Sequence, residues 1–240
     1  MIERRRLLLM RHGAVDYFDA DGRPVQPDAV PLTIAGIEQA QAMGAALGAA
    51  GVRIDRAITS GLQRTRQTAE EVLAAAEAKP PLEHWPELQE IRPGHLPSIP
   101  EAKLREAFIA AFEGPVPRET RFLEGETIGA LLDRTLPALQ RLLDAENWDT
   151  ALMVLHAGVN RGLLSWFLTG QPVFLGGIAQ DTGCMNIIDV GPQPHTSVVR
   201  VVNFCAIDTL QTATRLSTME HLLQKYLNLR QRQGNLGDLV

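Results

Sequence analysis

The stretch LLLMRHG, residues 7–13, decides the fold of this chain. Its first four residues are apolar, and an apolar run this short is typical of a buried strand in a parallel sheet. Arg11, His12 and Gly13 follow the run directly. In open α/β sheets, ligands bind in the crevice beyond the carboxyl ends of the strands. Arg11 and His12 are therefore expected to face such a crevice.

The rest of the 240-residue chain alternates short apolar runs with longer amphipathic stretches. This alternation predicts an α/β fold, in which a mostly parallel sheet is flanked by helices on both faces. Further strands are expected at residues 54–59, 151–156, 186–190 and 197–204. Helices are expected at residues 34–50, 62–78, 101–112, 127–145, 159–168 and 217–233.

Particular residues mark the expected ends of the first two helices. Thr33 and Ser60 are candidate N-caps, because a side-chain oxygen there can accept a hydrogen bond from an N–H group of the first turn. Gly51 is expected to end the first helix, since glycine adopts the left-handed conformation that closes many helices. Pro80 is expected to end the second helix.

A single domain over residues 1–240 is expected, because a chain of this length can bury a substantial core. Residues 86–126 are rich in proline and glycine, and the helix at 101–112 is their one expected regular element. This composition predicts an insertion that covers one face of the sheet rather than an independent domain.

Composition and charge argue against several classes of protein. The formal net charge is −5, whereas nucleic-acid-binding proteins usually carry a basic domain or stripe. No stretch approaches the roughly 20 apolar residues that span a bilayer, and the apolar run after the first arginines is too short for a signal peptide. The two cysteines are too few for a disulfide framework. A cytoplasmic protein without nucleic-acid or membrane partners is expected, and a homodimer is left open.

A second histidine occupies the same kind of position as His12. His156 follows the apolar residues 151–155 and precedes Ala157 and Gly158. A single histidine at a strand end is more often structural than functional, but two at one edge of a sheet favour a shared site. Neither histidine has the spacing of a metal ligand, so no metal site is expected.

Arginines supply what a phosphate site needs. The guanidinium of Arg11 can form two parallel charge-assisted hydrogen bonds to phosphate oxygens. Arg64 lies near the start of the helix at 62–78, where the helix macrodipole also favours an anion. Arg66 lies on a different face of the same helix, so one of these two arginines can point over the strand ends. The sequence thus predicts a phosphate site beside the two histidines.

Four segments together resemble the histidine phosphatase superfamily, which includes the cofactor-dependent phosphoglycerate mutases. The resemblance implies a phosphoglycerate mutase-like fold. It also implies an enzyme that hydrolyses a phosphate monoester through a phosphohistidine, without a metal or other cofactor. The segments are in the family's order: LLLMRHG at 7–13, TSGLQRTRQTA at 59–69, LQEIRPG at 88–94 and VLHAGVNRGLL at 154–164.

Matching motif positions carry the family's roles to individual residues. The resemblance implies that His12 is the nucleophile. It also implies that Glu90 is the general acid, which protonates the leaving group and then activates water. Glu126, which lies between Gly125 and Thr127, is the alternative general acid. The implied phosphate ligands are Arg11, Arg64, His156 and the backbone N–H of Ala157. Arg66 falls at a position without a family role and is expected to be a surface or salt-bridge charge.

The chain departs from the family pattern after His12. Many relatives have a phosphate-binding asparagine there, whereas residues 14–18 are AVDYF. Tyr17 could replace that hydrogen bond or could pack against the loop. A mutase needs a second anion subsite, yet Arg23 is the only cation within residues 14–31. A phosphatase is therefore favoured over a phosphoglycerate mutase-type phosphotransferase.

A catalytically silent phosphate-binding or scaffold protein is a further alternative, although the complete set of motif residues argues against it. The expected partner is a small-molecule phosphate ester. The residues do not distinguish a sugar phosphate, a nucleotide-loop phosphate such as α-ribazole phosphate, or a phosphoprotein. The insertion at residues 86–126 is expected to cover whichever substrate binds.

Overall fold

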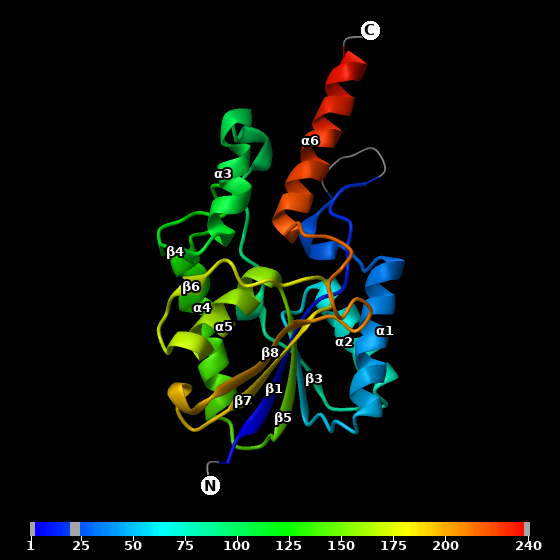
Figure 1. Ribbon diagram of the computed structural model, residues 1–240, viewed down its shortest axis with the longest axis vertical. Coiled ribbons are helices and arrows are strands. Elements are labelled where there is room, and N and C mark those ends of the chain that lie inside the picture. Colours follow the sequence, from blue (N-terminus) through cyan, green and yellow to red (C-terminus); the bar gives the residue numbers. More distant parts are fainter. Residues whose placement is uncertain (1–2, 20–24, 238–240) are drawn as a thin grey trace.

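A six-stranded sheet forms the centre of the computed structural model, which describes residues 3–19 and 25–237 (Figure 1). Arg23, the cation of the segment after His12, lies outside the described residues. The strand order is β3-β2-β5-β1-β7-β8. The strands are β1 (Arg5–Arg11), β2 (Arg56–Thr59), β3 (Leu82–His84), β5 (Thr150–Leu155), β7 (Met185–Val190) and β8 (Val198–Phe204).

Strand β1 lies inside the sheet, parallel to β5 on one side and antiparallel to β7 on the other. The register pairs Arg11 with Leu155, the last residues of their strands. The residues that follow β1 and β5 therefore start side by side at one edge of the sheet. Strands β2 and β3 are parallel to β5. Strand β8 is antiparallel to β7 and therefore runs in the same direction as β1, so β7 is the one antiparallel strand of this sheet among the described residues. The predicted mostly parallel sheet is confirmed.

Helices cover both faces of the sheet, as predicted. In Figure 1, α1 and α2 lie on one side of the strands, and α4 and α5 lie on the other. All expected helices are present, with shifted ends. Their bounds are α1 (Ile34–Ala49), α2 (Gln63–Ala75), α3 (Leu104–Ile109), α4 (Ile128–Asp144), α5 (Ala157–Thr169) and α6 (Thr218–Gly237).

The alternation of side chains along β1 explains why both faces are covered. Successive residues of a strand point to opposite faces of the sheet. Leu8 and Met10 belong to the core cluster that includes residues of α1 and α2. Leu7 and Leu9 belong to the cluster that includes residues of α4 and α5. All four side chains are at most 1% exposed, so the apolar run at 7–10 is buried on both faces.

Several short elements were not predicted, because two or three residues carry no periodic pattern. A second sheet consists of β4 (Pro115–Val116) and β6 (Phe174–Leu175). The helix predicted at 101–112 is α3 with a tighter turn at each end. The 3-10 turns are Pro27–Ala29, Pro86–Leu88, Leu96–Ser98, Glu101–Lys103, Ala110–Phe112 and Pro194–Thr196.

Helices α3 and α6 rise beyond the carboxyl ends of the parallel strands (Figure 1). Tyr226 of α6 stacks on Phe108 of α3, with ring centroids 6.0 Å apart, and lies 6.4 Å from the ring of Phe18. Leu223 of α6 is buried in the core cluster on the α5 side. The last helix therefore packs against the core through its apolar side chains. No helix within the described residues has the length and apolar character to cross a membrane.

The predicted helix caps are right for Thr33 and wrong for Ser60. Thr33 accepts a hydrogen bond from the N–H of Gly36 at 3.1 Å. Helix α2 instead begins at Gln63, after Leu62, without a side-chain cap. The hydroxyl of Ser60 lies 2.8 Å from Nε2 of His156. This serine therefore contacts the second strand-end histidine and does not cap the helix.

Candidate active site

His12 lies at the carboxyl end of β1 and is 1% exposed. Its backbone N–H donates to the carbonyl of Leu155 at 3.0 Å, which ties it to the end of β5. The next N–H, of Gly13, donates to Oγ1 of Thr68 at 3.0 Å. A Cβ at position 13 would overlap the backbone of Gly36, so only glycine allows the chain to cross α1 this closely.

The hydrogen bond of the His12 ring fixes its tautomer. Nδ1 lies 2.8 Å from the carbonyl oxygen of Gly13. A carbonyl oxygen can only accept, so we assign the proton to Nδ1 and a free lone pair to Nε2. Burial, together with the charges of Arg11 and Arg64, holds the pKa of His12 well below its usual range. The ring is therefore neutral at pH 7, as a nucleophile must be.

The ring of His156 lies beside that of His12, with centroids 5.3 Å apart and planes inclined by 64°. Nε2 of His156 contacts the Ser60 hydroxyl, while Nδ1 is buried without a hydrogen-bond partner among the described residues. Burial, followed by the charge of Arg64, lowers the pKa of His156 well below its usual range. If Ser60 donates to Nε2, the neutral ring presents Nδ1–H as a donor for a ligand.

Two buried guanidinium groups flank the histidines. Arg11 is 4% exposed and Arg64 is 3% exposed. Nη1 of Arg11 donates to the Gln180 carbonyl at 2.5 Å and to Thr218 Oγ1 at 2.8 Å. Its Nε is buried without a partner in residues 3–19 and 25–237. The guanidinium of Arg64 lies 5.9 Å from the centre of the Tyr17 ring. Tyr17 thus packs over this cation.

The carboxylate of Glu90 lies at the N-terminus of α5, next to His156. Its Oε2 accepts a hydrogen bond from the N–H of Gly158 at 3.1 Å, and Oε1 accepts one from Ile91 at 2.9 Å. A Cβ at position 158 would come within 2.6 Å of Oε1, so Gly158 admits the carboxylate. The structure therefore brings Glu90 to the same strand edge as the histidines, although it is 66 residues away from His156 in the chain.

Glu126, the alternative general acid, is held in an ion pair. Its carboxylate accepts hydrogen bonds from Nε and Nη2 of Arg134 at 2.8 and 2.9 Å and from the N–H of Arg92 at 2.9 Å. Burial raises the pKa of Glu126, but these hydrogen bonds outweigh it and lower the pKa below its usual value. A carboxylate held ionised in this way is a poor proton donor.

Arg134 is a functional candidate that the sequence reasoning missed. Its guanidinium also donates to the carbonyls of Glu87, Gln89 and Glu90, at 2.8, 2.6 and 3.1 Å. It therefore fixes the loop that carries Glu90 onto α4. Its position inside an amphipathic helix was the only signal in the sequence, and such arginines usually face solvent.

Other cationic residues of α2 and of the insertion at 86–126 do not join this group. Arg66 is exposed, as expected for a surface charge. Arg118 forms an ion pair with Asp133. The described residues contain no group of three or more His, Cys, Asp or Glu side chains that could hold a metal ion. The remaining cations of the insertion are exposed: Arg92, His95, Lys103, Arg105 and Arg121.

Buried histidines at two neighbouring strand ends, with two arginines and one carboxylate beside them, are the groups that phosphoryl transfer through a histidine requires. The model of the histidine phosphatase superfamily (branch 1) matches residues 7–203. The chain therefore belongs to that superfamily, and the resemblance drawn from its four segments is confirmed.

Particular relatives agree with this class. An adenosylcobalamin/alpha-ribazole phosphatase of Escherichia coli (strain K12) is 31% identical over 210 residues, which are 84% of this chain and 97% of the relative. The crystal structure of the alpha-ribazole phosphatase from Shigella flexneri is 27% identical and has a TM-score of 0.60, over 82% of this chain and 96% of that one. YhfR of Bacillus stearothermophilus is 26% identical with a TM-score of 0.64, over 82% and 95%. The predicted phosphatase class and phosphoglycerate mutase-like fold are confirmed.

Proposed function

We propose that this histidine phosphatase hydrolyses a small-molecule phosphate monoester, with Nε2 of His12 as the nucleophile. The observation that carries the proposal is the contact between Nδ1 of His12 and the Gly13 carbonyl, which leaves the Nε2 lone pair free. Nε2 attacks phosphorus, the ester oxygen leaves, and a phosphohistidine forms. Water then attacks the same phosphorus and releases inorganic phosphate and neutral His12.

The phosphoryl oxygens bind to donors that surround His12. Arg11 and Arg64 are buried cations, and buried charges act strongly on a ligand because little water screens them. Nδ1–H of His156 and the backbone N–H of Ala157, at the first position of α5, supply two further donors. These groups neutralise the charge that spreads over the equatorial oxygens in the transition state.

Glu90 acts as the general acid and then as the general base. An alkoxide leaving group needs a proton, and Glu90 is the carboxylic acid that the structure holds beside His156. After the leaving group departs, the Glu90 carboxylate removes a proton from the attacking water. The ion pair of Glu126 with Arg134 supports the choice of Glu90 over Glu126.

The first natural substrate to test is α-ribazole phosphate. Two relatives are named as phosphatases of that substrate, and this chain matches almost the whole length of each. Residues 86–126 and α6 lie near the carboxyl edge of the sheet, where they would cover a substrate within the single domain. We also propose a cytoplasmic location and no nucleic-acid partner, which the net charge of −5 and the two unpaired cysteines support. A homodimer stays open.

The test is hydrolysis of p-nitrophenyl phosphate in excess EDTA by the wild type and by His12→Ala. We expect metal-free turnover in the wild type and a loss of several orders of magnitude in the variant, since the substitution removes the intermediate. His95→Ala is the matched control, because His95 is exposed and lies outside the site.

Two results would contradict the proposal. Turnover by His12→Ala within tenfold of the wild type would exclude His12 as the nucleophile. Loss of wild-type activity in EDTA would point to metal-dependent chemistry. Trapping of labelled phosphate on His12, followed by its transfer to an added alcohol rather than to water, would instead identify a phosphotransferase.

A further inference from the structure

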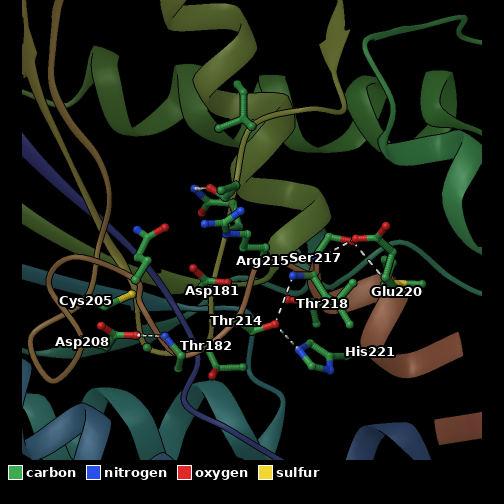
Figure 2. Close-up of a pocket in the computed structure, with 18 of the residues that line it drawn as sticks. Asp181, Thr182, Cys205, Asp208, Thr214, Arg215, Ser217, Thr218, Glu220 and His221 are labelled. Atoms are coloured by element: carbon green, nitrogen blue, oxygen red, sulfur yellow. Dashed lines mark hydrogen bonds between the residues drawn. The ribbon is translucent and has the colours of Figure 1, made fainter. Parts of the chain in front are cut away.

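A cavity of about 630 Å³ lies beside the candidate active site but outside it. Its walls are the loop at residues 176–183, the segment at 205–221 and the side chains of Phe112 and Arg161 (Figure 2). His12, His156 and Glu90 do not line it. Gln180 and Thr218 line the cavity and also bind Nη1 of Arg11, so they form the partition between the two sites.

One wall of this cavity comes from beyond the part of the chain that the family model matches. That match ends at residue 203, and the segment at 205–221 follows it. Figure 2 shows Arg215, Ser217 and Thr218 of this segment near Asp181 of the facing loop. The cavity is thus built jointly by the phosphatase fold and by the C-terminal segment.

Arg161 is a buried cation that lines this cavity. It is 4% exposed, and its Nε donates to the carbonyl of Ile178 at 2.8 Å. Its guanidinium carbon lies 4.9 Å from the centre of the Phe112 ring. Among the described residues, neither terminal nitrogen has a hydrogen-bond partner and no carboxylate forms an ion pair with Arg161. The fully buried atoms without a partner do not include these two nitrogens, so they remain accessible from the cavity that Arg161 lines and can bind an anion from outside the chain.

The three carboxylates of the cavity do not supply that anion. Asp181 accepts a hydrogen bond from the Asn203 amide at 2.8 Å. Asp208 accepts from the backbone of Thr212 at 3.0 Å, within its own turn, and Glu220 accepts from the backbone of Ser217 at 2.7 Å. Each carboxylate is therefore engaged by a neighbour other than Arg161.

Electrostatics agrees with the geometry. Burial, and then the charge of Arg11, lowers the pKa of Arg161 to about 10, although the nearby carboxylates of Glu90 and Asp181 act in the opposite direction. Even so, Arg161 remains protonated at pH 7. Two buried cations, Arg11 and Arg161, thus act on each other across the partition, and an anion bound to Arg161 would relieve this repulsion.

We propose that this cavity is a second ligand site, in which Arg161 binds the carboxylate group of a small organic anion. The planar guanidinium offers two parallel donors to such a group. Phe112, Ile178 and Met219 supply apolar surface for the rest of the molecule. Because Thr218 contacts both this cavity and Arg11, the ligand adjoins the group that binds the transferred phosphoryl.

The experiment is a titration of the full chain with benzoate, a planar aromatic carboxylate, followed by ligand-observed NMR with and without vanadate. Vanadate occupies phosphoryl sites and leaves the second site open. We expect benzoate to bind in both conditions, and Arg161→Met to weaken this binding at least tenfold. Arg215→Met is the matched control, because it removes an exposed cation from the same cavity. It should change the affinity less than threefold.

A second readout does not depend on the affinity. Benzoate should raise the melting temperature of the wild type but not that of Arg161→Met. No benzoate binding to the wild type would overturn the proposal, as would displacement of benzoate by vanadate. Equal losses in the Arg161 and Arg215 variants would do the same, since they would indicate attraction by general positive charge.

Discussion

Proton placement on two histidines controls the chemistry at the scale of single residues. A carbonyl oxygen holds the proton of His12 on Nδ1, whereas the Ser60 hydroxyl contacts Nε2 of His156. The two rings therefore use opposite nitrogens for support. His12 is left with a lone pair that can attack phosphorus. When the Ser60 hydroxyl donates to Nε2 of His156, that ring is left with an N–H that can bind the phosphoryl oxygens. Ser60 is a positioning residue in this arrangement.

The substitution Glu90→Gln tests the proton donor. The amide keeps the shape of the side chain but cannot donate and recover a proton. We expect turnover of alkyl phosphates to fall by a factor of about 10²–10⁴, while aryl phosphates, whose leaving groups need little protonation, lose much less. The measurement is kcat for glycerol phosphate and for p-nitrophenyl phosphate.

Glu87→Gln is the control for this prediction, since Glu87 is exposed on the same loop. It should leave both rates near those of the wild type. Equal losses on the two substrates in Glu90→Gln would assign the proton to another group.

At the scale of elements, the site depends on how α4 holds the first residues of the insertion. Arg134 binds three carbonyls of residues 87–90 and the Glu126 carboxylate. Its side chain is 17% exposed and that of Glu126 is 10% exposed, so the pair is mostly removed from water. Loss of Arg134 would leave three carbonyls without these donors and the Glu126 carboxylate with only the N–H of Arg92.

The substitution Arg134→Met should therefore destabilise the protein and misplace Glu90. We expect the free energy of unfolding to fall by about 3–5 kcal/mol, the usual cost of breaking a buried ion pair. The ratio of alkyl to aryl phosphate turnover should also fall, which a purely structural role would not cause. Urea unfolding and the two kinetic assays measure these effects.

Arg141→Met is the matched control, because Arg141 also lies on α4 and binds Glu87, but its side chain is 50% exposed. Exposed ion pairs contribute about 0–1 kcal/mol, so its unfolding free energy should hardly change. An unchanged substrate ratio in Arg134→Met would limit Arg134 to a structural role.

At the scale of the whole molecule, the fold keeps two histidines neutral in its interior. Both have pKa values well below 6.5 in the folded state, mainly because burial disfavours the charged ring. The unfolded chain binds a proton at each of these histidines as the pH falls below about 6.5. The unfolded state then binds more protons than the folded state, so acid favours unfolding.

We predict that the free energy of unfolding is highest above pH 7 and falls as the pH drops below about 6.5. The two histidines together contribute a slope of up to about 2.7 kcal/mol per pH unit. Urea unfolding at a series of pH values between 7.5 and 5 measures it. The double variant His12→Ala/His156→Ala should flatten the curve over this range. The same slope in the wild type and in the double variant would show that other groups cause the dependence.

The sequence alone determined the α/β class, the order of the long elements and the residues that meet at the strand edge. Two properties made this predictable: apolar runs such as residues 7–10 can only be buried, and strand-end positions place His12 and His156 at one edge of a parallel sheet. Boundaries and short elements were less accurate, because β3, β4 and β6 span two or three residues and have no periodicity.

Only the tertiary structure decided the partners of each polar group. It showed that Ser60 contacts His156 instead of capping α2, that Glu126 is paired with Arg134, and that Arg161 is buried beside a second cavity. The physical reason is that a side chain's protonation and pairing depend on groups that are distant in the chain. Those groups become neighbours only when the helices pack against the sheet.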